Sequence, residues 1–454
     1  MRGIDHGANA AAFLSDAKQA AWHDRALWHV RQKRDAAARS VPEWEDLRWE
    51  AQRIKEHTLD HLAYYLEKFE AAAKRNGIEV YWARDAAEHN RIVHRLLSEI
   101  GAQKVVKSKS MLTEECGLNP YLQERGIEVT DTDLGERIVQ LAGEHPSHIV
   151  LPAIHLKKEQ VGAIFARHLG TPEELADPTA LTRAAREHLR RKFLEADAAI
   201  TGVNFALAEE GGIVVCTNEG NVDLGTALPP LHIACMGIEK LIPDAKSLGI
   251  FTRLLARSAT GQAITAYTSH FFKPAPGKWL AVILVDNGRS DLLCSESSEA
   301  LRCIRCGACM NTCPVYRRSG GHSYESVIPG PIGSVLSGAR EPEAAASLTF
   351  ACTLCASCDA VCPVRIPLHE ELLKERKRTV HAPRYRGKVR GLRFAAWMLR
   401  HPRLYRAGLK LYSWSLKHLP RSWIYNRANA WGRDREMPVP AERSFAEWME
   451  ERKK

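Results

Sequence analysis

The spacing of apolar residues changes near the start of the chain. From Ala10 to Asn76 apolar residues recur every three or four positions, as in "IKEHTLDHLAYYLEKFEAAAKRNG", and the one proline of this stretch is Pro42. This period is typical of amphipathic helices, and Gly77 is expected to end the last of them. We therefore predict an N-terminal helical region at residues 1–76.

Beyond Gly77, short apolar runs alternate with segments of helical period. Strands are predicted at "IEVYWA", "KVVKS", "IEVTDTD" and "HIVLPAI", with helices between them. The segment "AAITGVNFALAEEGGIVVCTNEG" is expected to form two strands around a Glu-Gly-Gly turn, and "ITAYTSHFF" and "WLAVILVDN" are expected to form two more. This alternation predicts an α/β domain at residues 77–290, with a parallel sheet covered on both faces.

The rest of the chain has no strand pattern. Residues 291–373 carry two cysteine runs. Between the runs, the Gly and Pro content of "SYESVIPGPIGSVLSG" predicts an ordered loop, and "REPEAAASLTF" is predicted to be a helix. Residues 374–454 are helical in period and basic. The predicted fold class is α/β plus all-α.

Twelve cysteines are present, and eight lie in the runs "CIRCGACMNTCPV" from Cys303 and "CTLCASCDAVCPV" from Cys352. No segment has the length of a signal-peptide core or a membrane span, so we expect a cytoplasmic protein whose thiols stay reduced. Metal binding is then favoured over disulfides for the two runs. The other four are expected to be ordinary core or surface residues: Cys116, Cys216, Cys235 and Cys294.

In each run three cysteines are two residues apart, and a fourth follows after three more residues, before a proline. Zinc sites usually combine two separated Cys-x2-Cys pairs, so zinc is the weaker alternative. The spacing is that of [4Fe–4S] clusters in which the fourth cysteine binds the other cluster of a pair. We predict two [4Fe–4S] clusters that relay electrons, with purely structural clusters as the alternative. The first is assigned to Cys303, Cys306, Cys309 and Cys362, and the second to Cys352, Cys355, Cys358 and Cys313.

The segment "KVVKSKSMLTEE" is the best candidate for a ligand-binding element of the α/β domain. Lys107 and Lys109 alternate with Ser108 and Ser110 after a predicted strand, at the edge where open α/β sheets hold ligands. Lysines and hydroxyls there suit a carboxylate or a phosphate. A solvated strand end is the alternative.

A second candidate is "CTNEGNVD", where Asn218, Glu219 and Asn221 follow another predicted strand. It is predicted to be either a polar ligand loop or a turn. His155 is expected to be a structural histidine rather than a base. No Walker loop and no strand-linked G-x-G-x-x-G are present, so nucleotide binding is not predicted.

Charge is concentrated near the C-terminus. The formal net charge of the chain is +10, but residues 371–435 contain eighteen Lys or Arg and three acids. Tryptophans are interspersed there: Trp397, Trp414, Trp423 and Trp431. Docking of a partner subunit is the favoured interpretation, ahead of a solvated face with the tryptophans packed back and of an anionic membrane surface. No nucleic-acid-binding motif accompanies the charge.

Taken in order, these motifs resemble the iron–sulfur B subunit family of bacterial lactate-utilisation systems. The resemblance covers nearly the whole chain. It rests on "EHTLDHLAYYLEKFE", "KVVKSKSM", "SHIVLPAIH", "TNEGN", "GPIGSVL" and the two cysteine runs. It implies a LUD-type domain, related to CoA-transferase and ribose-phosphate-isomerase-like folds, then an α-helical ferredoxin module and a family-specific C-terminal region.

The resemblance also implies a function. The chain would be a non-catalytic or co-catalytic subunit that passes electrons during oxidation of L-lactate to pyruvate. Its companions would be a protein with cysteine-rich repeats and a protein with a single LUD-type domain. The eight run cysteines carry over as cluster ligands, whereas no catalytic residue does. A glycolate-type system, a LUD-domain transferase or isomerase with structural clusters, and a scaffold that anchors its companions through the basic tail remain as alternatives.

Overall fold

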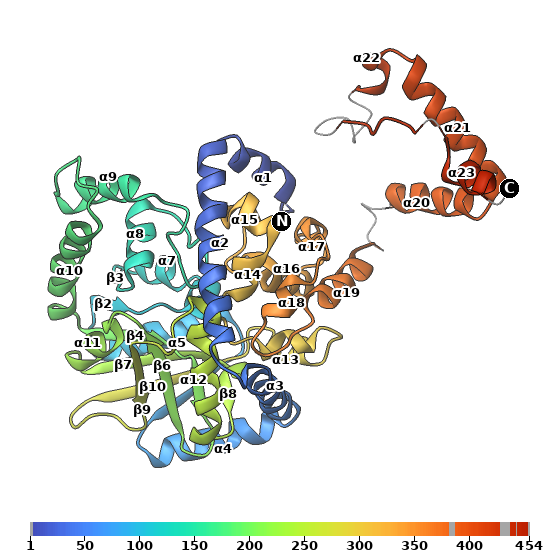
Figure 1. Ribbon diagram of the computed structural model, residues 1–454. Coiled ribbons are helices and arrows are strands. Elements are labelled where there is room, and N and C mark those ends of the chain that lie inside the picture. Colours follow the sequence, from blue (N-terminus) through green and yellow to red (C-terminus); the bar gives the residue numbers. More distant parts are fainter. Residues whose placement is uncertain (1–2, 381–385, 427–435, 442, 453–454) are drawn as a thin grey trace. The chain divides into compact units, whose positions relative to one another are not determined.

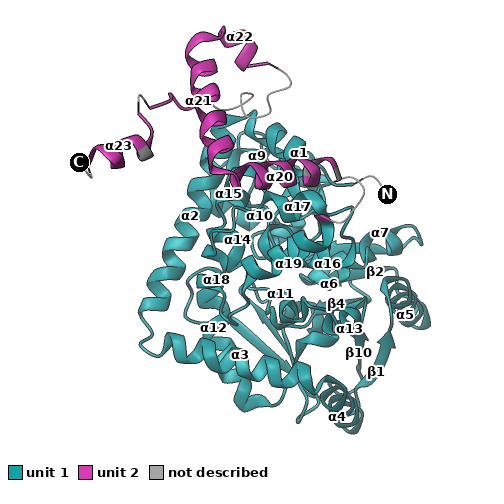
Figure 2. Ribbon diagram, turned by 90° about the vertical axis from the view of Figure 1, so that its right-hand side faces the viewer, with its two compact units in different colours: residues 1–379 teal, residues 380–454 magenta. Residues whose placement is uncertain are grey.

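The computed structural model describes residues 3–380, 386–426, 436–441 and 443–452. The chain divides into two compact units, residues 1–379 and 380–454, which Figure 2 shows in teal and magenta. Trp431, one of the four tail tryptophans noted in the sequence, lies outside the described residues.

Four helices open the chain: α1 (His6–Leu14), α2 (Ala17–Arg39), α3 (Trp44–Asp60) and α4 (Leu62–Arg75). The side chains of Asp5 and Asp16 cap α1 and α2 by accepting backbone N–H bonds of their first turns. Helix α2 packs against α12 (Ala245–Ala259) on one side and against α14 (Ala308–Thr312) and α15 (Pro314–Ser319) on the other, as Figure 1 also shows. The N-terminal helices therefore join the sheet domain to the cysteine-bearing region.

A six-stranded sheet forms the centre of the α/β domain. Every neighbouring pair in it is parallel. The strand order is β1 (Glu79–Ala83), β10 (Trp279–Val285), β7 (Leu231–Gly237), β4 (Ala198–Gly202), β2 (Lys104–Lys107), β3 (Glu128–Asp131). Strands β4 and β7 are buried along their whole length, as expected for a parallel sheet covered on both faces.

The helices of this domain pack around the sheet or at its edges (Figure 1). Besides α12 they are α5 (Ala86–Glu99), α6 (Met111–Glu115), α7 (Leu118–Gln123), α8 (Leu134–Ala142), α9 (Lys158–Leu169), α10 (Pro178–Leu194) and α11 (Asn221–Ala227). The short 3-10 helix η1 (Ile238–Lys240) follows β7 directly. The predicted α/β class is confirmed.

A second, four-stranded sheet has the order β8 (Leu241–Ile242), β5 (Phe205–Leu207), β6 (Gly212–Thr217), β9 (Tyr267–Phe271). The segment 198–220, predicted to contain two strands, contains three, because β4 ends before the hairpin of β5 and β6 begins. Gly211 turns this hairpin with a φ of +66°, and a Cβ there would lie 2.3 Å from the backbone of Ala72. Only glycine fits that approach.

The cysteine-bearing region consists of short helices and loops, with no strand among its described residues. Its elements are α13 (Arg289–Leu293), η2 (Ser298–Arg302), α14, α15, η3 (His322–Tyr324), α16 (Gly330–Arg340), α17 (Ala346–Ala351), α18 (Ser357–Val361) and α19 (Leu368–Val380). The all-α part of the predicted fold class is thus confirmed.

Two local predictions were wrong. The segment 148–154, predicted as a strand, is a loop, because the His148 ring accepts the backbone N–H groups of Val150 and Leu151 and curls the chain. The segment between the cysteine runs that was predicted as a loop contains helix α16. Pro331 lies in the first turn of this helix, where proline is well tolerated.

The second unit consists of α20 (Arg386–Leu399), α21 (Pro402–His418), α22 (Arg421–Ile424) and α23 (Phe445–Arg452). Helix α21 has no buried residue, and Trp397, Trp414 and Trp423 are all exposed, the last to 71%. Within this unit, none of these three tryptophans is buried. No helix among the described residues is long and apolar enough to cross a membrane.

Candidate functional site

The two cysteine runs share an unusual backbone conformation. Arg305 and Leu354, each two residues after the first cysteine of a run, have positive φ values of 60° and 55°. This conformation turns their backbone N–H groups toward the preceding sulfur atoms. Arg305 N lies 3.4 Å from Cys303 Sγ, and Leu354 N lies 3.2 Å from Cys352 Sγ. Such bonds stabilise negative charge on sulfur.

The residue after the second cysteine also has positive φ in both runs. Gly307 has a φ of +76° and Ala356 of +56°, and a short helix, α14 or α18, starts immediately afterwards. The two positions differ in their surroundings. A Cβ on Gly307 would lie 2.8 Å from the His148 ring, so the first run requires glycine where the second carries alanine.

Four cysteines surround one small cavity. The remaining wall is apolar or backbone, with no charged side chain among the described residues that line it. Sulfur is therefore the one strong ligand type in this space. The cysteines are Cys303, Cys306, Cys309 and Cys362, and the apolar wall includes Ile149, Ile304, Ile332, Val364, Ile366 and Leu368.

The other four cysteines form a neighbouring group. Cys352 and Cys355 are close enough to Cys313 for their charges to act on it, and Cys313 acts likewise on Cys358. Cys358 is also within electrostatic range of Cys309, so the two groups adjoin. This second group is more open to solvent, because Cys355 is exposed whereas all members of the first group except Cys303 are buried.

The thiols have the chemistry of a metal-binding set. All twelve cysteines are free, including those crowded together in the runs. Burial raises the pKa of Cys313 and Cys362 to about 11, although backbone N–H groups near the sulfurs oppose the shift. Burial and then neighbouring cysteines raise the pKa of Cys309 well above its usual value. Thiolates at these positions need a cation to bind, and the small sulfur-lined cavity fits an iron–sulfide cluster.

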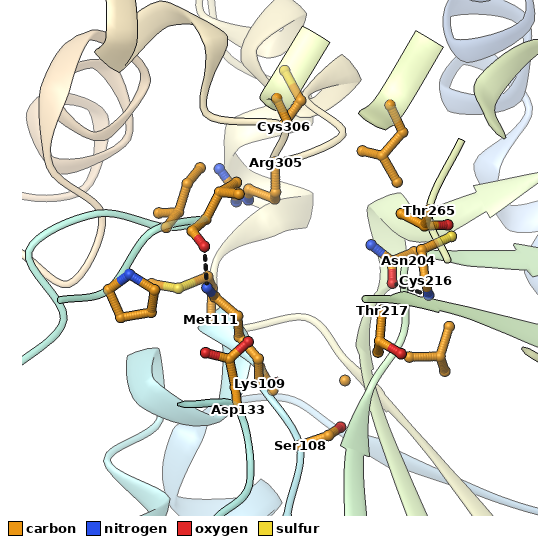
Figure 3. Close-up of a pocket in the computed structure, with 18 of the residues that line it drawn as sticks. Ser108, Lys109, Met111, Asp133, Asn204, Cys216, Thr217, Thr265, Arg305 and Cys306 are labelled. Atoms are coloured by element: carbon orange, nitrogen blue, oxygen red, sulfur yellow. Dashed lines mark hydrogen bonds between the residues drawn. The ribbon is translucent and has the colours of Figure 1, made fainter. Parts of the chain in front are cut away.

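A much larger cavity, of about 510 Å³, lies beside the first cysteine group. Figure 3 shows Arg305 and Cys306 at the top of this cavity, Cys216, Thr217 and Thr265 at one side, and Ser108 at the bottom. The cavity thus extends from the carboxyl ends of sheet strands to a cysteine of the first group. Cavities of this size and mainly apolar lining hold organic ligands.

The structure separates the two lysines that sequence analysis proposed as ligands. Lys107 is fully buried, and its Nζ lies 2.7 Å from Glu114 and 2.8 Å from Asp131. Burial alone would lower the pKa of Lys107, but the two carboxylates outweigh it and raise the pKa. Lys107 therefore fixes the end of β2 and is not part of the cavity lining. Lys109 does line the cavity, where its Nζ donates a 2.8 Å hydrogen bond to the Val150 carbonyl.

The "TNEGN" loop also borders the cavity. Asn218 is held by Gln262 at 3.0 Å and accepts the backbone N–H of Ala266. Glu219 accepts the backbone N–H of Leu134 at 2.9 Å. Burial, and then the Asp133 carboxylate, raise the pKa of Glu219 to about 7. This loop is therefore both a structured turn and part of the cavity wall.

Three polar atoms of the lining are buried without a hydrogen-bond partner among the described residues. They are Ser108 Oγ, Thr217 Oγ1 and Arg305 Nη1. Unsatisfied buried polar groups are costly and need an explanation. Their common position in one cavity indicates a space built to hold polar ligand atoms or water.

Sequence analysis missed the charged residues at the Cys306 side of the cavity. Lys240 and Arg305 both contribute to the lining there. Burial lowers the pKa of Lys240 to about 8, so its amine stays protonated at neutral pH. Arg305 could have been singled out, because it lies inside a cysteine run; Lys240 could not, because nothing in the sequence brings η1 to the first run.

The remaining candidates have structural partners. His155 bonds Ser147 through Nδ1 at 2.8 Å and Glu144 through Nε2 at 2.7 Å, and its ring packs edge-on against His322. Cys116 and Cys235 are buried, Cys216 is half-buried and Cys294 is exposed. Of these four, Cys216 and Cys235 line the large cavity, which the sequence did not indicate.

Three family models match the chain: the LUD domain at residues 66–280, a 4Fe-4S dicluster domain at 299–366, and the C-terminal model of lactate utilisation protein B at 382–454. Lactate utilization protein B of Shouchella clausii is 42% identical over 94% of this chain and 92% of its own length. An uncharacterized electron transport protein of Escherichia coli, YkgF, is 40% identical over 89% of this chain and 88% of its own length. A crystal structure of a DUF162 family protein from Deinococcus radiodurans covers 49% of this chain and 98% of its own, at 15% identity and a TM-score of 0.28.

Proposed function

The chain belongs to the lactate utilisation protein B family, and from this we propose that it is the iron–sulfur electron-transfer subunit of a system that oxidises L-lactate to pyruvate. Its LUD domain and its iron–sulfur module are established by the family models. The number of clusters, the residues that bind them and the reaction in which they take part are proposed.

We assign two [4Fe–4S] clusters to the two cysteine groups, in the crossed arrangement that the spacing predicts. The first is held by Cys303, Cys306, Cys309 and Cys362, which surround the small sulfur-lined cavity. The second is held by Cys352, Cys355, Cys358 and Cys313. When bound, each cluster accepts and passes on one electron at a time.

The observation that carries the proposal is the position of Cys306. This residue lines both the small sulfur-lined cavity and the 510 Å³ cavity of the LUD domain. A molecule held in the large cavity would therefore be next to a ligand of the first cluster. The second group is the more exposed one, which suits an exit toward a partner.

The surroundings of the first group supply hydrogen bonds and positive charge. Arg48 donates from Nε to the Cys362 carbonyl at 2.9 Å, and Arg34 donates to the Val361 carbonyl at 3.2 Å. Both arginines come from the N-terminal helices, which explains why these helices pack across the module. Positive charge near a cluster favours its reduced state.

We also propose that companion lactate-utilisation subunits dock on the basic second unit. Residues 386–426 contain ten Lys or Arg and no acid. The exposed Trp397, Trp414 and Trp423 supply apolar contact area on the same unit. Basic and aromatic residues are enriched at protein interfaces with acidic partners.

Metal analysis and a growth assay on L-lactate together test this proposed function. Anaerobically purified protein should contain about eight irons and eight sulfides per chain. Replacing Cys309 by serine should remove about half of the iron and also abolish growth on L-lactate, while Cys294→Ser should change neither. About four irons in the wild-type chain would refute two clusters, and intact growth of the Cys309→Ser strain would refute the relay.

A further inference from the structure

Charged side chains gather where the large cavity meets the first cysteine group. Cations outnumber carboxylates by three in this network, and Lys55, Arg289 and Glu239 are buried within it. The cations are Lys55, Lys240, Arg289, Arg305 and Arg340, and the carboxylates are Glu115 and Glu239.

Both carboxylates are shared between several cations. Arg289 lies 2.6 Å from Glu239 and 3.1 Å from Glu115. Arg340 lies 2.5 Å from Glu115, and Arg305 lies 3.8 Å from Glu239. No carboxylate among the described residues is therefore left over to balance the lysines of the network.

The cysteine thiolates offset part of this excess. Lys55 and Lys240 are both within electrostatic range of Cys303. A [4Fe–4S] cluster with four thiolates carries a net charge of about −2 in its oxidised form. About one positive charge then remains without a counter-charge. The other nearby arginines do not remove this excess, because Arg34 shares Asp35 with Arg31 and Arg48 shares Glu45 with Arg365.

The excess charge faces the cavity. The Lys240 ammonium group makes no hydrogen bond or ion pair with any described residue, and Arg305 Nη1 is buried without a partner. Both residues line the cavity near Cys306. At the far end the situation is different, because Lys109 has Glu219 and Asp133 close to it.

We propose that the Cys306 end of the cavity binds the carboxylate of a small monocarboxylic acid, with Arg305 and Lys240 as the hydrogen-bond donors. A planar guanidinium and an ammonium group match the two oxygens of a carboxylate. A single negative charge completes the balance of the network. The inference rests on the proposed function, because the balance includes a cluster on the first cysteine group.

The same charge balance couples ligand affinity to redox state. Reduction adds one negative charge next to Arg305 and Lys240, which removes the excess that holds the carboxylate. The acid therefore binds the oxidised protein more tightly than the reduced protein. By linkage, the bound acid must lower the reduction potential of the first cluster. A tenfold difference in affinity corresponds to about 59 mV for one electron.

The experiment uses the anaerobic protein with its full iron content. Binding of L-lactate, pyruvate and neutral lactamide is measured by calorimetry, before and after reduction with dithionite. We expect one carboxylate per chain, at least tenfold weaker binding of lactamide, and at least tenfold weaker binding of L-lactate after reduction. A potentiometric titration followed by paramagnetic resonance should show the matching fall in potential with saturating L-lactate.

Variants locate the site. Lys240→Met should weaken L-lactate binding at least tenfold, Lys240→Arg should largely restore it, and Lys246→Met, an exposed lysine on α12, should have no effect. Equal binding by the oxidised and reduced forms, or by lactamide and L-lactate, overturns the inference. If iron content and cluster signals are complete but no acid binds, the inference fails and the relay stands; if the clusters are missing, the proposed function itself fails.

Discussion

The hydroxyl oxygens of Thr312 and Ser357 lie 2.5 Å apart, and this contact joins the two cysteine runs. Thr312 directly precedes Cys313, and Ser357 directly precedes Cys358. The contact thus brings the last cysteine of the first run to the third cysteine of the second run. Helices α14 and α18 pack together along the same line. Crossed sharing of ligands requires this arrangement.

The crossed sharing of cluster ligands between the two runs leads to a prediction about serine variants. Cys313→Ser and Cys358→Ser should abolish the same paramagnetic signal, because both residues belong to the second group. Cys309→Ser should abolish the other signal. Each variant should retain about four irons, as measured by metal analysis of anaerobic protein. If Cys313→Ser removes the signal that Cys309→Ser removes, the ligands are not crossed.

The two runs also contain a matched pair of backbone positions. Gly307→Ala should destabilise the first cluster by about 1–3 kcal/mol, because the new Cβ would press on the His148 ring in a left-handed conformation. The control is Ala356→Gly at the equivalent position of the second run. Bleaching of the visible absorbance with heating should occur earlier for Gly307→Ala and hardly change for Ala356→Gly. Equal bleaching of both variants and wild type would contradict the packing argument.

Acid binding should depend on the protonation of Glu219. The pKa of this residue is raised to about 7, so its side chain is neutral below that pH and negative above it. A negative charge in the cavity repels a carboxylate, even though Lys109 offsets part of it. Affinity for L-lactate should therefore fall as the pH rises from 6 to 8. In Glu219→Gln the part of this fall centred near pH 7 should be lost, whereas the fall toward pH 8 that comes from deprotonation of Lys240, whose pKa is lowered to about 8, should remain. A profile identical to wild type would exclude the role of Glu219.

The second unit should be separable from the clusters. A chain ending at Val380 keeps the whole first unit and every run cysteine. It should retain about eight irons and lose co-purification with the companion subunits. Full-length protein with Arg400, Arg403 and Arg406 changed to glutamine should bind the companions more weakly, with less dependence on salt. Unchanged co-purification of the shortened chain would place the docking surface elsewhere.

Sequence patterns were sufficient where local chemistry decides the structure. The alternation of strands and helices predicted the parallel sheet, and cysteine spacing predicted an iron–sulfur module. Sequence patterns predicted the wrong structure where contacts between residues distant in the sequence determine the conformation. The segment His148–Ile154 has the composition of a strand. However, Nδ1 of His148 accepts the backbone N–H of Val150 in the same segment, and Nε2 of His148 forms a hydrogen bond with Asn311, which is 163 residues away in the sequence. This pairing holds the segment as a loop beside the first cysteine group.

The candidate ligand site was predictable in the same limited way. The sequence offered Lys107 and Lys109 together as candidate ligands at the end of β2, with a solvated strand end as the alternative, but Lys107 is fully buried and only Lys109 of the two lines the cavity. The sequence could not show that Lys107 points to Glu114 and Asp131 while Lys109 points into the cavity. Nor could it place Lys240 beside Cys303, because that proximity depends on how η1 packs against the cysteine-bearing region.

The most direct test of the relay is lactate-driven reduction in the reconstituted complex, followed by paramagnetic resonance. In wild-type protein, L-lactate and the companion subunits should reduce both clusters. In Cys309→Ser, the second cluster should remain reducible by dithionite but not by L-lactate, since electrons enter at the cluster beside the cavity. Reduction of the second cluster by L-lactate in Cys309→Ser would contradict the account.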